Sequence, residues 1–128
     1  MKLEGSSLEE LEAASESALE GTAAQLRGLL AHLALRLRPF PAFLNMLSVQ
    51  AVELEPPLRP VADRGCVVVL PDGDICRLDL TVVPGVQGVR DVDHVEEFRE
   101  LELSAEEYIV YAATAIRELC RELRRRAG

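Results

Sequence analysis

The sequence predicts an α+β fold in two layers, with a long N-terminal helix and a C-terminal helix packed on one face of an antiparallel sheet of three or four strands. Three patterns support this fold class: helical apolar spacing in residues 7–38, a β-hairpin signature in residues 65–83, and an amphipathic helix after residue 104. The 128 residues suffice for a single domain, 1–128. We expect disorder only in residues 1–5 and 127–128.

The N-terminal helix is predicted to begin at Ser7, because Ser7 and Glu10 have capping-box spacing. Its apolar stripe, weakest at two polar positions, consists of Leu8, Leu11, Ser15, Ala18, Thr22, Leu26, Leu29, Leu33 and Leu37. Gly21 either separates two short helices or lies within one continuous helix, which we favour. A continuous helix over residues 7–38 would be about 48 Å long, more than a compact domain of this size needs. We therefore expect part of it to project or to pack on another chain.

Residues 39–54 follow the first helix and contain a candidate recognition segment. Pro39 and Pro41 end the helix, and we expect a brief helix through residues 43–47 and then a strand over residues 49–54. Large apolar side chains gather beside the helix end, as in a partner-binding patch, and the candidates are Phe40, Phe43, Leu44, Met46 and Leu47. The alternative, which we prefer, is that they build the core, because the chain has few other aromatic residues.

The hairpin in residues 65–83 has the most informative local sequence. Pro71-Asp72-Gly73 predicts a three-residue loop with a G1 bulge. This loop predicts a register that pairs Leu70 with Asp74, Val68 with Cys76 and Cys66 with Leu78. One face is then uniformly apolar and consists of Cys66, Val68, Leu70, Cys76, Leu78, Leu80 and Val82. We expect the C-terminal helix to cover this even-numbered face.

The C-terminal third contains a possible edge strand and the second helix. Residues 99–103 alternate as an edge strand would, whereas Val92, Val95 and Phe98 have helical spacing over a short run. Ser104 and Glu107 form a capping box. The helix after it has an apolar stripe of Ala105, Ile109, Ala112, Ile116, Leu119 and Leu123, widened by Tyr108, Ala113 and Cys120.

Composition and charge restrict the class of protein. The net charge of −8 disfavours binding to nucleic acid or to anionic membranes, and no run of about 18 apolar residues is present. The sequence begins without the apolar segment of a signal peptide, so we expect a cytoplasmic protein. The three cysteines are interpreted as buried free thiols, because Cys66 and Cys76 are diagonal neighbours about 7 to 8 Å apart in the predicted register.

Potential metal ligands in residues 91–97 support one further hypothesis. Asp91, His94 and Glu97 supply oxygen and imidazole ligands for a divalent ion if a turn brings them together. The spacing matches no strong metal signature, and an acidic segment of this kind is more often a solvated loop. No nucleophile elbow, phosphate loop or dinucleotide fingerprint is present, so we expect no cofactor.

These observations favour a small acidic, non-catalytic module that forms a homodimer and binds a protein partner. A small acidic helix–sheet–helix chain that dimerises has a shape shared by secretion chaperones, and this is an analogy of architecture and composition alone. The alternative is a metal-assisted or acid–base enzyme that uses Asp91, His94 and Glu97, with a tyrosine such as Tyr108 nearby.

Overall fold

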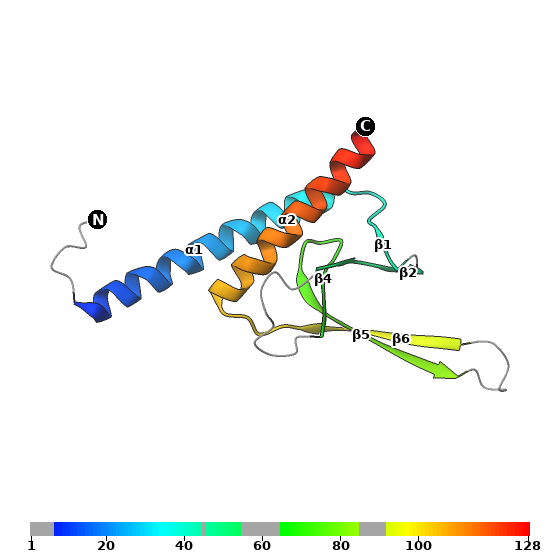
Figure 1. Ribbon diagram of the computed structural model, residues 1–128, viewed down its shortest axis with the longest axis horizontal. Coiled ribbons are helices and arrows are strands. Elements are labelled where there is room, and N and C mark those ends of the chain that lie inside the picture. The colour runs from blue at the N-terminus through cyan, green and yellow to red at the C-terminus, as the bar shows by residue number, and fades with distance from the viewer. Residues whose placement is uncertain (1–6, 45, 55–64, 85–91) are drawn as a thin grey trace.

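The computed structural model describes residues 7–44, 46–54, 65–84 and 92–128, without the side chains of residues 46–48, 80–84 and 92–95. Within these residues, two helices and six strands follow one another in the chain order α1 Leu8–Leu35, β1 Ala42–Phe43, β2 Met46–Gln50, β3 Val52–Glu53, β4 Cys66–Val69, β5 Ile75–Pro84, β6 Val92–Glu100 and α2 Ala105–Ala127 (Figure 1). One antiparallel sheet has the strand order β3-β4-β5-β6, and β1 and β2 form a separate antiparallel pair. This arrangement confirms the predicted α+β class.

The four-stranded sheet has a different apolar layer on each face. Both helices pack against the odd-numbered face, where Val67, Val69 and Ile75 join the core that contains Leu30 and Leu119. The even-numbered face contributes to a second core, which consists of Phe43, Val49, Ala51, Val68, Cys76 and Leu78. The helices therefore share one face as predicted.

The prediction that α2 covers the even-numbered face is wrong. Residues 43–47 do not form the expected brief helix, and the β1–β2 hairpin instead supplies Phe43 and Val49 to that face. The Ala51 N–H donates to the carbonyl oxygen of Pro41 at 3.1 Å and closes this hairpin. A strand pair with inward apolar side chains can cover a sheet face as well as a helix can.

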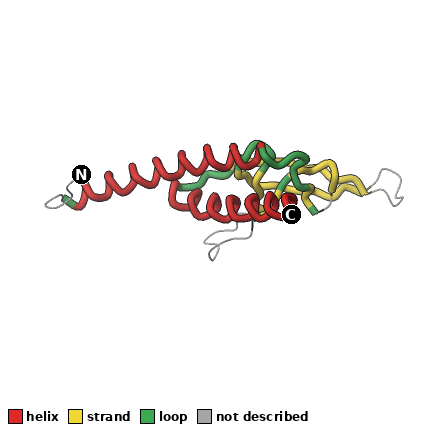
Figure 2. Tube along the Cα trace, turned by 90° about the horizontal axis from the view of Figure 1, so that it is seen from above, coloured by secondary structure: helices red, strands yellow, loops and turns green. Residues whose placement is uncertain are grey.

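Helix α1 is continuous through Gly21, as we favoured, and ends at Leu35. The Ser7 hydroxyl accepts a hydrogen bond from the Glu10 N–H at 3.2 Å and caps the first turn. Burial begins only at Ala23, and the buried residues of the helix are Ala23, Leu30 and Ala34. The first four turns therefore extend beyond the rest of the described chain, as Figures 1 and 2 show.

The hairpin of β4 and β5 has the predicted register, with Cys66 opposite Leu78 and Val68 opposite Cys76. The Leu70 N–H donates to the Asp74 carbonyl oxygen at 2.9 Å, and the Gly73 N–H donates to the Leu70 carbonyl oxygen at 2.8 Å. Gly73 has φ +88°, as a G1 bulge requires. The sequence therefore determines this local geometry completely.

The remaining strands differ in their boundaries from the predicted ones. Residues 49–54 divide between β2 and β3, which belong to different sheets. The expected edge strand of residues 99–103 overlaps the observed edge strand β6 only at Arg99 and Glu100, because β6 spans Val92–Glu100 and residues 101–103 are outside any strand. The helical spacing in residues 92–98 therefore has no counterpart in the structure.

Helix α2 has the predicted capping box, in which the Ser104 hydroxyl accepts from the Glu107 N–H and the Glu107 carboxylate accepts from the Ser104 N–H. Its buried residues are Tyr108, Tyr111, Ala112, Ala115 and Leu119. Two of these buried residues, Tyr111 and Ala115, are absent from the predicted stripe. The helix extends to Ala127, and residues 1–5 lie outside the described residues. No described helix is long and apolar enough to cross a membrane.

Candidate interaction surface

The most exposed apolar surface of the molecule lies on helix α1. Among the described residues, the large hydrophobic side chains with substantial exposure are Leu8, Leu19, Leu29, Leu35, Leu44 and Phe98. Four of these six belong to α1. Exposed large side chains that share one element are more informative than scattered ones, which are normal on any protein surface.

We define the overhang as residues 8–22 of α1, the part before the first buried residue. None of its residues is buried, and Leu8 retains 71% of its accessible surface. The overhang contains five glutamates and neither lysine nor arginine. An isolated helix of about 15 residues is only marginally stable in water, because most helical stability in proteins comes from packing. The overhang is therefore a mostly exposed helix, in which only Leu11 and Ala14 are half-buried.

The apolar stripe of α1 is only partly covered by the rest of the domain. At 3.6 residues per turn, the line through Leu8, Leu11 and Leu29 lies about a quarter turn from the buried line through Ala23 and Leu30. Leu29 is 45% exposed, and Leu26 and Leu33 are only partly covered by the core. Helix α1 thus has one apolar face for its own domain and a second that faces solvent.

The candidate recognition segment of residues 40–47 is divided between the core and the surface. Phe40 and Phe43 are 3% and 5% exposed and belong to different cores, so a partner does not meet them at the surface. Leu44 is 70% exposed and has φ 47° at the turn between β1 and β2. Met46 and Leu47 lie on β2, and their side chains are outside the description.

Two of the three candidate metal ligands lie on a strand and not on a helical turn. Asp91 is outside the described residues, whereas His94 and Glu97 both belong to strand β6, opposite Val82 and Asp79. The Glu97 carboxylate accepts a hydrogen bond from Arg99 at 3.0 Å. Within the described part of the chain, no group of three or more His, Cys, Asp and Glu residues is arranged to hold a metal ion.

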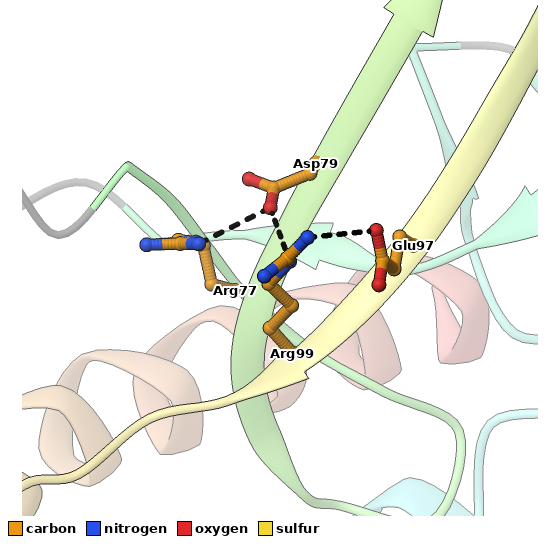
Figure 3. A network of polar contacts seen from close by, with 4 residues as sticks. All are labelled: Arg77, Asp79, Glu97 and Arg99. Carbon is orange, nitrogen blue, oxygen red and sulfur yellow. Dashed lines mark hydrogen bonds and ion pairs between the residues drawn. The ribbon is translucent and has the colours of Figure 1, made fainter.

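Four charged side chains form a network on the odd-numbered face of β5 and β6 (Figure 3). They are Arg77, Asp79, Glu97 and Arg99. The Asp79 carboxylate contacts Arg77 at 3.2 Å and Arg99 at 2.9 Å, and Glu97 contacts Arg99 at 3.0 Å. The network contains two positive and two negative groups and so has no net charge. Partly exposed pairs of this kind each contribute less than about 1 kcal/mol. We interpret the network as the polar continuation of the sheet face.

Burial raises the pKa of two cysteines and of a tyrosine. Burial raises the pKa of the Cys76 thiol to about 11 and also raises the pKa of Cys66, where Glu53 and Asp79 add to the effect. Burial likewise raises the pKa of Tyr108, whose ring lies 4.4 Å below the Arg27 guanidinium. All three groups are neutral near pH 7, and a neutral thiol is a poor nucleophile.

Comparison with known proteins adds no family. No protein-family model matches the chain, and neither a curated protein sequence nor a solved structure matches it. The functional argument therefore depends on the residues of this chain alone.

Sequence reasoning anticipated the excess length of α1 but missed where its exposed leucines lie. Leu19 and Leu35 are absent from the predicted stripe, and both are exposed. The available signal was the presence of these two leucines outside the predicted apolar stripe.

Proposed function

We propose that this protein is a small, non-catalytic, chaperone-like module that forms a homodimer and binds other proteins, and that helix α1 is its main contact element. The observation that supports the proposal most directly is the overhang, a helical segment with exposed leucines and no buried residue. Association with a second chain would bury these leucines and stabilise a segment that is too short to be stable alone.

Two further observations agree with a non-catalytic role in the cytoplasm. All three cysteines are free thiols, as is usual in reducing compartments. The ionisable groups of the sheet pair with one another rather than converge on a common point. A catalytic site requires several convergent groups with perturbed proton affinities.

Light scattering across a concentration series tests the proposal. We expect a mass of twice 14.1 kDa at micromolar concentration and a shift towards the monomer when Leu8→Ser and Leu29→Ser are combined. Leu44→Asn is the matched control, because Leu44 is equally exposed but lies on the β1–β2 turn, where asparagine tolerates the positive φ.

The outcomes separate the two exposed surfaces. A strict monomer at all concentrations would contradict the homodimer. A dimer that Leu44→Asn dissociates, and that the α1 double variant leaves intact, would move the contact surface from α1 to the β1–β2 turn.

A further inference from the structure

We infer that two copies of this chain pair through their α1 helices in antiparallel orientation, with the acidic overhang of one copy against the basic carboxyl end of α1 in the other. This inference rests on the proposed homodimer and adds its geometry. Three independent features of α1 support it: the separation of charge along the helix, the symmetry of the apolar stripe, and the small residues at its centre.

The charge changes sign along α1 and the three residues that follow it, where Arg36 caps the helix and Arg38 lies beyond it. Residues 8–22 contain five glutamates and no basic residue, whereas residues 23–38 contain three arginines, Arg27, Arg36 and Arg38, and no acidic residue. Helices α1 and α2 run side by side in the same direction, so the arginines that end α2 lie on the same side of the molecule as the carboxyl end of α1 (Figures 1 and 2). An antiparallel pair places opposite charges together. A parallel pair places the five glutamates of one copy beside the five glutamates of the other.

The apolar stripe has a similar residue spacing when it is counted from either end of the helix. A two-fold axis between antiparallel helices requires this symmetry. With the axis near residues 20–21, the facing pairs are Leu8 with Leu33, Leu11 with Leu29, Ser15 with Leu26 and Ala18 with Thr22. Leucines thus cover both ends of the contact, and each overhang lies on the exposed stripe of the other copy.

The centre of the stripe suits a close approach of two helices. Ala18 is small, and a Cβ atom added at Gly21 would meet nothing within 4 Å. The Thr22 hydroxyl donates to the Ala18 carbonyl oxygen at 2.9 Å, so its burial at the axis leaves no donor without a partner. The edge strand is a less suitable contact, because β6 exposes Glu97, Arg99 and Glu100, and charges on an edge oppose strand pairing.

Disulfide trapping of two single variants tests the orientation in the full-length protein. Leu11→Cys and Leu29→Cys are purified separately, oxidised alone and in an equimolar mixture, and compared with the oxidised wild-type chain, which retains its three native thiols. Antiparallel pairing predicts a linked dimer only in the mixture, because the two positions face each other and disulfides require nearby Cβ atoms. Peptide mapping must show that the link joins the two introduced thiols.

A charge experiment gives a second readout that does not depend on trapping. Glu12→Gln with Glu16→Gln should raise the dimer dissociation constant roughly tenfold at low salt, and the difference should shrink at high salt. Glu53→Gln with Glu100→Gln is the matched control, because both residues lie on the sheet face away from the helices.

Each contrary result has a distinct meaning. Linked dimers from either variant alone, or a tighter dimer after Glu12→Gln with Glu16→Gln, would show parallel pairing and overturn the inference while the homodimer stands. A stable dimer that no combination links would place the contact elsewhere and also overturn it. A strict monomer would overturn both the inference and the proposed function.

Discussion

At the residue scale, Gly73 connects the hairpin turn to helix α1. Its φ of +88° lies in the region that side chains with a Cβ atom avoid. A Cβ atom at this position would also lie 2.7 Å from the backbone nitrogen and the Cα atom of Ala31. These two constraints are independent, so only glycine satisfies both the turn and its contact with α1.

We therefore expect Gly73→Ala to lower the free energy of unfolding by about 2 to 4 kcal/mol, from the combined strain of a positive φ and an overpacked contact. Gly28→Ala is the control, because Gly28 lies inside the packed part of a helix with open space around it, and this change should raise stability by about 0.5 to 1 kcal/mol. Urea denaturation of both variants checks the prediction, and equal stabilities would contradict it.

Glu122 gives a pH-dependent prediction at the same scale. Hydrogen bonds from Arg125 and then Arg126 lower the pKa of Glu122 to about 2, from an ordinary value of 4.5. A lowered pKa means that the pairing stabilises the folded state above pH 4.5 and that this stabilisation is lost as the pH falls towards 2. The wild-type chain should therefore exceed Glu122→Gln in thermal stability at pH 7, with the difference vanishing near pH 2. A difference that persisted at pH 2 would show that the side-chain shape matters rather than its charge.

At the scale of single elements, the features that depend on neighbouring residues in the sequence were predictable. The features that depend on which element covers which face of the sheet were not. The hairpin register follows from Pro71-Asp72-Gly73, and both helix starts follow from Ser7 and Ser104, because a cap or a turn depends on neighbours within four residues. The sheet face that α2 covers depends on where the β1–β2 hairpin lies. The pattern of residues 43–47 contains no signal for that choice.

The overhang gives a prediction for one element. We expect amide hydrogens in residues 8–22 to exchange quickly at low protein concentration and to become protected as the concentration rises through the dimer dissociation constant. Residues 23–35 pack on the domain and should keep their protection throughout. Hydrogen–deuterium exchange measured at two concentrations checks this contrast. Strong protection of the overhang in a demonstrated monomer would contradict the need for a second chain.

At the scale of the whole molecule, the fold class and the continuous first helix were predictable, because length, hydrophobic period and capping agree with one another. The candidate site was predictable only in part. The excess length of α1 indicated a contact element, whereas the burial of Phe40 and Phe43 was visible only after the two cores were located. A single sequence does not show which of two apolar segments closes a core.

The contact between the hairpin turn and α1 also has a consequence for the order of folding. The hairpin closes a loop of three residues, whereas the contact between Gly73 and Ala31 spans about forty residues of chain, with a correspondingly larger entropy cost of loop closure. The hairpin is therefore expected to form first and to serve as the surface onto which α1 docks. Destabilising changes in the turn should then slow folding, whereas changes in the overhang should mainly accelerate unfolding.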